Sequence, residues 1–316
     1  MKKKLDGGLK IISITFLVFF IISKNTFSSQ ILDYETENFI YQIIEDISNV
    51  NIISKKIKFK INNNNEINAF VDINNTIHIN SGLIINCNDY VALLSVLAHE
   101  IGHIELNHIS LRKKTIESSN KLNNLTLLSV IASSAITQKP ELLQGSIVTS
   151  AALSNQYIIF SKEQEMEADL YALNTLKLLN TNSQSVIDLL LKIEQKLLQK
   201  GFNEESQRIS THPYFKDRIQ LIKNFENNDK INFSLKYNET FNFIKAKFIG
   251  YSDNEDNLNN LDEPFKTYAE SIKNARSGNL KKSLERLNTI IKNNYNNSFL
   301  LETKADILFS YGYTKE

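Results

Sequence analysis

The sequence predicts an α+β fold that is mainly helical and contains one small antiparallel sheet. Apolar residues recur at helical spacing in several segments, a pattern typical of amphipathic helices. Three short apolar runs before residue 80 are separated by Asn-rich turns, which indicates neighbouring antiparallel strands. The 316 residues are 42% hydrophobic and 22% charged. This composition is enough for a sizeable core and a second domain.

The N-terminus resembles an export signal. Four lysines lie within the first ten residues, and an apolar run follows over residues 11–22. Thr26 to Ser28 resembles a small-x-small cleavage signal. The run is short for a spanning helix, so we expect a cleaved signal peptide over residues 1–29. The alternative is an uncleaved inner-membrane anchor through residues 11–22 with its lysines on the cytoplasmic side. In both cases the bulk of the chain is exported.

Charge and cysteine content exclude some classes of partner and stabilisation. The formal net charge is +1, so there is no electrostatic reason to expect nucleic acid or an acidic substrate. Cys87 is the single cysteine, which rules out an internal disulfide and leaves stability to the core. We expect its side chain to be a small buried apolar group.

The elements before residue 90 follow from periodicity. Residues 35–50 carry a helical apolar stripe. Strands are expected at Lys56–Ile61, Ile67–Ile73 and Thr76–Ile79. An edge strand of this sheet could bind an extended peptide by main-chain pairing, or the sheet could simply shield the next helix. Asp89 is the expected N-cap of that helix.

The segment from His99 to His108 holds three of the five histidines. On a helix, His99 and His103 lie about 40° apart, so both imidazoles can bind one metal ion. Glu100 lies about 100° from His99, where it can reach a water at the metal. This H-E-x-x-H pattern supplies two ligands and a general base. His108 lies about 180° from His99 if the helix continues, so we interpret it as a polar residue near the helix C-terminus.

A third ligand is expected within residues 161–169. Glu165 and Asp169 are four residues apart and share a helix face. Glu165 can complete a His₂Glu zinc site with an open fourth position. Asp169 can then orient a ligand imidazole through its second nitrogen. Spacing alone does not separate Glu165 from Glu163 or Glu167.

These motifs carry a family resemblance. His-Glu-Ile-Gly-His at 99–103, followed by the E-x-x-A-D run that begins at Glu165, resembles the HtpX/BepA/Oma-type zinc metallopeptidases, which include the CAAX prenyl proteases. The resemblance covers roughly residues 35–225 and implies a gluzincin fold with one Zn²⁺. It places the third zinc ligand at Glu165 and the family's Asp at Asp169.

Smaller motifs extend the resemblance. The tripeptides at 68–70 and 81–83 match the family's strand segment before the metal helix. Thr211-His212-Pro213 and Arg218 resemble its H-P-x-x-x-x-R motif. The resemblance implies that His212 either occupies the open zinc position and blocks water, or stabilises the tetrahedral intermediate. It also implies that Arg218 holds the Glu/Asp network. The alternative is that both residues only brace a helix.

The middle of the chain is less informative. Residues 125–136 and 147–153 are apolar helix-like runs that are too short to cross a bilayer. We interpret them as a core helical hairpin; the alternative is a hairpin that covers the cleft or touches the membrane. HtpX-type members have spanning helices in this area, so the sequence resembles the periplasmic BepA-like branch more closely. Residues 185–200 predict another amphipathic helix, and 241–249 a short apolar segment between Asn-rich linkers.

The C-terminal part has an internal period. Gly278 and Gly312 are 34 residues apart, the tetratricopeptide spacing. We expect an incomplete helical module of this type over residues 264–316, which would offer a surface to a protein partner. The metallopeptidase domain is expected at 30–235, with a connecting helix and linker at 236–263.

The sequence therefore predicts an exported, periplasmic zinc endopeptidase. His99, His103 and Glu165 bind zinc, and Glu100 is the general base. By resemblance, its substrates are misfolded or stalled envelope proteins. The alternative is a largely latent chaperone or assembly factor that contacts the outer-membrane assembly machinery through the C-terminal module. Peripheral membrane contact is compatible with either interpretation, and no nucleic-acid partner is expected.

Overall fold

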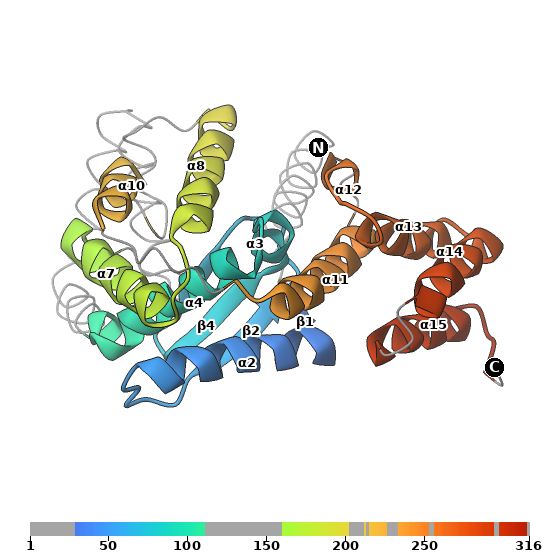
Figure 1. The fold of residues 1–316 in the computed structure, drawn as a ribbon, viewed down its shortest axis with the longest axis horizontal. Helices are drawn as coiled ribbons and strands as arrows, with labels where there is room; N and C mark the ends of the chain where they lie inside the picture. Colours follow the sequence, from blue (N-terminus) through green and yellow to red (C-terminus); the bar gives the residue numbers. More distant parts are fainter. Residues whose placement is uncertain are drawn as a thin grey trace, which may run out of the picture.

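The computed structural model describes residues 29–110, 160–201, 212, 215–225, 233–252, 256–293 and 297–314. Its fold is mainly helical with one small sheet, as predicted (Figure 1). Except for Ser29, the predicted signal segment lies outside the described residues, and so do the apolar runs at 125–136 and 147–153. None of the helices in the described ranges is both long enough and apolar enough to cross a bilayer.

The sheet is mixed, which corrects the antiparallel prediction. Its strands are β1 (Gln30–Ile31), β2 (Lys58–Asn62), β3 (Ala69–Val71) and β4 (Thr76–Asn80). Their order is β1-β2-β4-β3, with β4 antiparallel to β3 but parallel to β2. A tight turn, in which Asn75 has a φ of 57°, folds β4 back along β3. The chain passes from β2 to β3 and leaves the position between these strands empty. β4 then fills that position, antiparallel to β3 and parallel to β2.

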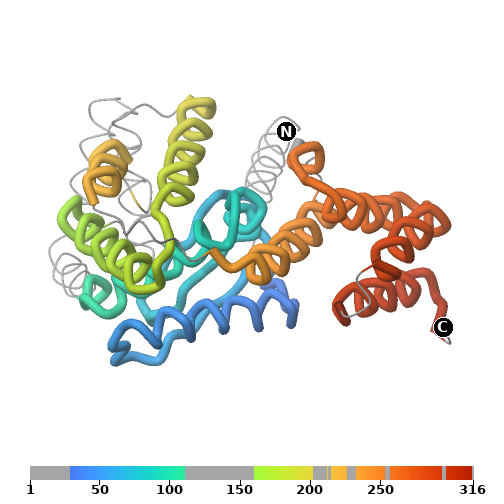
Figure 2. Tube along the Cα trace, in the orientation of Figure 1, coloured from blue at the N-terminus to red at the C-terminus, as the bar shows by residue number. Residues whose placement is uncertain are grey.

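Helix α4 (Tyr90–Glu105) is the central element of the N-terminal part. It contacts β3, α2 (Tyr34–Val50), α7 (Lys162–Leu178) and α8 (Gln184–Gln199). Figure 2 shows the path of the chain through these elements. The predicted N-cap is confirmed, because the Asp89 carboxylate accepts the Ala92 N–H at 2.9 Å. Burial along nearly its whole length holds this helix rigidly, which a metal site requires.

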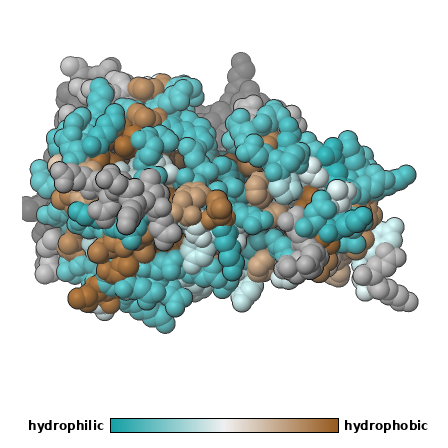
Figure 3. Space-filling view, viewed as in Figure 1, coloured by the Kyte–Doolittle hydropathy of each residue, from teal (hydrophilic) through white to brown (hydrophobic). Residues whose placement is uncertain are grey.

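Helices α7, α8 and α10 (Phe215–Asn224) lie together on one side of α4 (Figure 1). The predicted helix at 185–200 corresponds to α8. A small apolar cluster joins the three helices; it consists of Leu173, Ile187, Leu190, Phe215, Ile219 and Ile222. Apolar side chains such as Leu178 and Leu191 remain exposed on this side, and Figure 3 shows brown groups among the hydrophilic ones there.

Helix α11 (Leu235–Tyr251) is longer than the apolar segment that the sequence indicates. It packs against α2, α4, α13 (Phe265–Arg276) and α3 (Ser81–Asn86). A Cβ at Gly250 would lie 2.8 Å from the Ile272 Cβ, so α11 and α13 approach closely. The short helix α12 (Asp256–Asn259) lies between them in sequence.

The C-terminal helices are α13, α14 (Leu280–Asn293) and α15 (Ser298–Ser310). Gly278 and Gly312 have φ values of 81° and 84°, shortly after the ends of α13 and α15. Glycine adopts this left-handed conformation without the Cβ penalty, so the 34-residue period marks two equivalent helix ends. The tetratricopeptide interpretation and the domain boundaries stay predictions.

A buried lysine of α11, Lys247, lies between the start of α2 and helix α15. The Lys247 ammonium lies 2.9 Å from Asp33 and 2.6 Å from Glu35, at the beginning of α2. It also lies 5.9 Å from the centre of the Phe299 ring on α15. Burial opposes the charged form, but Tyr268 and the two carboxylates raise the pKa of Lys247 above its ordinary range.

Candidate metal centre

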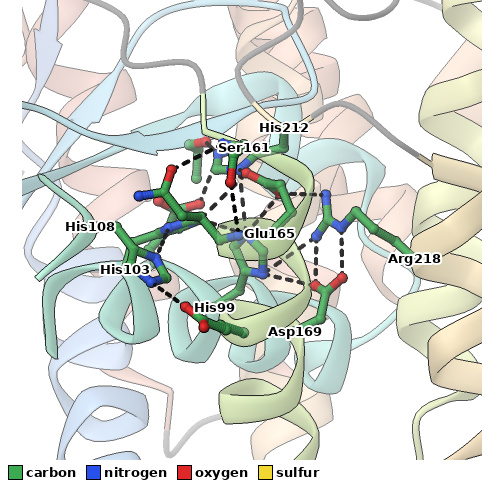
Figure 4. Close-up of polar contacts among 12 residues, drawn as sticks. His99, His103, His108, Ser161, Glu165, Asp169, His212 and Arg218 are labelled. Atoms are coloured by element: carbon green, nitrogen blue, oxygen red, sulfur yellow. Dashed lines mark hydrogen bonds and ion pairs between the residues drawn. The ribbon is translucent and has the colours of Figure 1, made fainter. Parts of the chain in front are cut away.

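Helices α4 and α7 bring the predicted ligands together. A Cβ on Gly102 would lie 3.1 Å from the Tyr171 Cβ, so the two helices pack closely at this level. His99 Nε2 and His103 Nε2 lie 3.0 Å apart. Glu165 reaches in from α7, with its Oε2 3.5 Å from His99 Nε2 and its Oε1 3.6 Å from His103 Nε2 (Figure 4). The structure therefore brings all three predicted ligands to one point.

Burial distinguishes the three glutamates that spacing leaves equivalent. The Glu165 side chain is 0% exposed, whereas Glu163 is exposed on the outer face of α7. Glu167 is 59% exposed, and its carboxylate contacts His108 rather than the Nε2 atoms of His99 and His103. Of these acids, Glu165 alone belongs to the cluster of potential ligand atoms in the described part of the chain.

The second nitrogen of His99 faces a buried ion pair. His99 Nδ1 lies 2.9 Å from Asp169 Oδ1. Arg218 on α10 donates two hydrogen bonds of 2.7 Å to Asp169 and lies 3.2 Å from Glu165. Burial would raise the pKa of Asp169, but Arg218 and His99 hold it below the ordinary value. The placement agrees with the predicted orienting position of Asp169, and Arg218 lies between the two carboxylates.

His103 has a corresponding partner that the sequence interpretation missed. Its Nδ1 lies 3.0 Å from His108 Nδ1, and His108 Nε2 lies 2.9 Å from Glu167 Oε2. His108 is 2% exposed and lies outside the cluster of potential ligands, as expected, but its ring contacts His103 instead of facing the opposite side of the helix. The helix does not continue as assumed: α4 ends at Glu105, and Asn107 has a φ of 63°, which turns the chain back.

Phe160 was also missed. Its ring stacks on His103 with the ring centres 3.6 Å apart and the planes at 13°. Phe160 precedes Ser161, the N-cap of α7, so the start of this helix fixes the ring. No sequence motif marks this phenylalanine, although its place just before a helix N-cap is a weak signal for a buried apolar residue.

The donor set fits a divalent metal ion. Each imidazole directs Nδ1 to an outer partner, so the two Nε2 atoms face each other and Glu165. Two lone pairs at 3.0 Å repel unless a cation lies between them. Burial and Arg218 oppose protonation of His99, but Asp169 and Glu165 raise its pKa; burial and His99 lower that of His103. The two facing Nε2 atoms and the Glu165 carboxylate therefore fit a single divalent cation.

Glu100 lies beside the cluster on α4. Its Oε1 is 3.1 Å from His212 Nε2. Among the residues that the structure describes, its buried Oε2 has no hydrogen-bond partner. A buried carboxylate oxygen without a partner costs free energy unless a ligand or water uses it. The orphan oxygen is the atom with which a general base would accept a proton.

His212 spans the cluster from a position before α10. Its Nδ1 lies 3.1 Å from Glu165 Oε1 and 3.3 Å from His99 Nε2, and its Nε2 lies 3.1 Å from the Ala69 carbonyl oxygen. All ligand atoms of His99, His103, Glu165 and His212 lie within 4.8 Å of one another. Burial opposes the charged form, but Glu165 and Glu100 raise the pKa of His212 to about 10. Thr211 and Pro213 of the predicted motif lie outside the described residues.

Comparison with known proteins finds relatives that are named as proteases. The chain is 26% identical over 215 residues to the beta-barrel assembly-enhancing protease of Yersinia pestis, covering 67% of this chain and 43% of the relative. It is 25% identical over 245 residues to the Escherichia coli K12 protein of that name, covering 76% and 49%. It is also 27% identical over 173 residues to the E. coli metalloprotease LoiP, covering 55% and 64%.

The chain thus spans about half the length of the beta-barrel assembly-enhancing proteases that it matches. Residues 35–226, more than half of the chain, match the model of peptidase family M48. This range contains α4 with His99 and His103, and α7 with Glu165. It also contains His212. From the motifs, the geometry and this match, the chain belongs to peptidase family M48.

Proposed function

We propose that this protein is an exported zinc endopeptidase in which His99, His103 and Glu165 hold the metal and Glu100 is the general base. The observation that carries the proposal is the convergence of two buried imidazole Nε2 atoms on one buried carboxylate. Two nitrogens and one carboxylate are the protein ligands of many catalytic zinc sites. Such a set leaves a further coordination position for chemistry.

Zinc held by His99, His103 and Glu165 would act as a Lewis acid that polarises the scissile carbonyl and makes water more acidic. Glu100 takes the proton of the attacking water on Oε2 and later delivers it to the leaving amine. Asp169 holds the His99 ring through Nδ1, and Arg218 forms ion pairs with both Asp169 and Glu165. Burial of these groups keeps bulk water away, which strengthens each electrostatic interaction.

An extended peptide fits the edge of the sheet next to this site. Asn68 O accepts the Asn80 N–H, and the Asp72 N–H donates to Thr76 O, so both residues bond towards β4. By the alternation of an antiparallel pair, Ala69 and Val71 direct their main-chain groups away from β4. Among the described strands, β3 pairs with β4 alone. A substrate strand can therefore pair with Ala69 and Val71 and place its scissile bond near Glu100.

His212 is proposed to keep the site latent. It contacts Glu100, Glu165 and the Ala69 carbonyl at once, so it lies across both the metal cluster and the strand edge. Substrate access requires these contacts to open. If His212 instead stabilises the tetrahedral intermediate, its removal lowers the rate. This arrangement also favours the second candidate function, a largely latent chaperone or assembly factor with a protein-binding C-terminal module.

We further propose a periplasmic location and misfolded or stalled envelope proteins as substrates. The relatives named beta-barrel assembly-enhancing protease support this proposal, as does the signal-like N-terminus. The outer-membrane assembly machinery is the proposed partner of the C-terminal module. Sequencing the N-terminus of the protein recovered from the periplasm tests the location, because cleavage near residue 28 excludes an anchor through residues 11–22.

The test combines metal analysis with casein cleavage. The wild type should hold one zinc per chain and cleave casein. Glu100→Gln should keep the zinc but lose about 10²–10⁴-fold in rate, because a general base contributes about that much. Glu163→Gln, a matched change on the exposed face of α7, should leave both unchanged. Equal cleavage by wild type and Glu100→Gln would exclude the proposed mechanism.

Two further experiments separate the remaining alternatives. His212→Ala should raise casein cleavage if His212 blocks the site, whereas a lower rate with normal zinc content assigns it to the transition state. A Glu100→Gln protein that restores growth to a deletion strain under envelope stress would favour the chaperone over the protease. Failure of Glu100→Gln to restore growth, while Glu163→Gln does, supports the protease.

A further inference from the structure

His108 occupies a built position behind the metal cluster. It contacts His103 at 3.0 Å and Glu167 at 2.9 Å, and it is 2% exposed although it lies outside the metal-binding motif. Figure 4 shows its ring directed at the back of His103, on the side away from Glu165. The three side chains form a line from the metal position to the surface, which Glu167 reaches with a 59% exposed side chain.

The turn that delivers His108 is fixed by tertiary contacts. The Lys55 ammonium donates to the Ile104 carbonyl and, at 2.8 Å, to Asn107 Oδ1. The Glu105 carboxylate accepts the backbone N–H groups of Ser54 and Lys55, both at 3.1 Å. These contacts hold the end of α4 against the segment between α2 and β2. Contacts at Glu105 and at Asn107 thus fix the turn that brings His108 back to His103.

The positions of the ring protons determine which group donates and which accepts in each contact of this line. A His103 ring that binds metal through Nε2 carries its proton on Nδ1. The Nδ1–H of His103 then donates to His108 Nδ1, which must be an unprotonated acceptor. A neutral His108 therefore carries its proton on Nε2, where it donates to the Glu167 carboxylate. Every ring nitrogen has one role, and no other neutral arrangement satisfies all three contacts.

We infer that His108 and Glu167 are positioning residues for the zinc ligand His103: His108 accepts the His103 Nδ1–H, and Glu167 fixes the tautomer of His108 that can do so. The inference rests on the proposed metal site. Groups of this kind set the ring orientation and basicity of a ligand imidazole, and their loss typically lowers metal affinity about 10–100-fold. Phe160 restricts the same ring from its face by stacking.

Two substitutions at position 108 separate hydrogen bonding from packing. His108→Phe keeps a planar ring but removes the acceptor, so zinc affinity of the full chain should fall about 10-fold or more. His108→Asn places a carbonyl oxygen close to the position of Nδ1, so it should restore most of that affinity despite its smaller volume. Competition with a chromophoric chelator at neutral pH measures the affinity. The visible spectrum of the cobalt(II) form should change for His108→Phe and resemble wild type for His108→Asn.

Glu167 provides a test at a site where folding is not at risk, because its side chain is largely exposed. Glu167→Ala should weaken zinc binding about 3-fold, less than loss of a direct partner. The matched control Glu163→Ala removes the same group one helical turn earlier on α7 and should bind zinc as wild type does. If His108→Phe does not fold, His108→Asn and the Glu167/Glu163 pair still decide the question.

The outcomes are distinguishable from those of the proposed function. Equal zinc affinities for His108→Phe and His108→Asn, whether both strong or both weak, would overturn the role of the acceptor. Equal affinities for Glu167→Ala and Glu163→Ala would overturn the role of Glu167. A wild-type chain that binds no zinc would instead overturn the metal site itself.

Discussion

The two histidine ligands lie four residues apart on one helix, yet the groups behind them differ. Behind His99, Asp169 accepts directly from the ring and is paired with Arg218 in full burial. Behind His103, the neutral ring of His108 intervenes, and the line ends at the exposed Glu167. We call Asp169 and Arg218 the first arm and His108 and Glu167 the second arm. The first arm consists of opposite charges inside the protein, and the second passes from a neutral group to solvent.

This difference follows from where each ring faces. His99 faces α7 and α10, where two layers of helix bury any partner, so a carboxylate needs a cation beside it. His103 faces the end of α4, where the chain turns back and the surface is near. A neutral acceptor needs no counter-ion there. The two arms should therefore contribute similarly to metal binding but very differently to folding.

Arg218→Met should have the largest effect, because it removes the cation that lies between the buried Asp169 and Glu165 carboxylates. We expect the free energy of unfolding of the metal-free protein to fall by about 3–5 kcal/mol, measured by urea denaturation. Arg286→Met is the matched control, since Arg286 pairs with Glu270 at a part-exposed site and should cost about 0–1 kcal/mol. Equal losses for the two variants would contradict the assignment of the first arm.

Asp169→Asn and His108→Phe should each lower zinc affinity, by about 10–100-fold for Asp169→Asn. Because the two residues act on different ligands, their effects on the free energy of zinc binding should add in the double variant to within about 0.5 kcal/mol. Chelator competition on the two single variants and the double variant measures this. A double variant no weaker than the worse single one would show that the arms are one coupled unit.

Acid should weaken the first arm in the metal-free protein. Burial acts to raise the pKa of Asp169, but Arg218 holds it below the ordinary value of 3.8. A lowered folded-state pKa adds stability above the unfolded-state pKa, and that stability is lost as the pH falls through the folded-state value. We expect a decline below about pH 4, of at most about 1.4 kcal/mol per pH unit from this group. Urea denaturation of Asp169→Asn across this range should show a shallower slope; an unchanged slope would exclude Asp169 as its source.

The smallest effect is expected at the outer end of the second arm. Glu167→Ala should change the free energy of unfolding of the metal-free protein by no more than about 0.5 kcal/mol, because the side chain is largely exposed. Its effect on zinc affinity should exceed its effect on folding. A loss of several kcal/mol on denaturation would mean that Glu167 braces the fold rather than the ligand.

Helical spacing was enough to predict His99 and, behind it, Asp169 of the first arm, whereas Arg218 came from the family resemblance. Helical spacing places His99 and His103 on one face and Glu165 with Asp169 on another, and these relations hold in any helix. The choice of Glu165 over its neighbours came from the family resemblance, and the structure adds the burial that separates them. The helical content and the Asp89 N-cap also follow from local signals.

The second arm and the sheet topology depend on contacts between distant segments. Asn107 is a recognisable residue for a left-handed turn, but Lys55 and Glu105 also fix this turn, and they are 50 positions apart. Periodicity alone extends the helix and turns His108 away. Likewise, alternation identifies β2, β3 and β4 but does not say that β4 inserts between the other two.

Lys247 makes the two ends of the described chain depend on each other. Its ammonium contacts Asp33 and Glu35 at the start of α2 and lies near the Phe299 ring of α15. Cutting away α15 would open this triad to water and remove the ring from the cation. A shortened chain would therefore lose order at its first helix, far along the sequence from the cut, and its zinc site should be studied only with α15 in place.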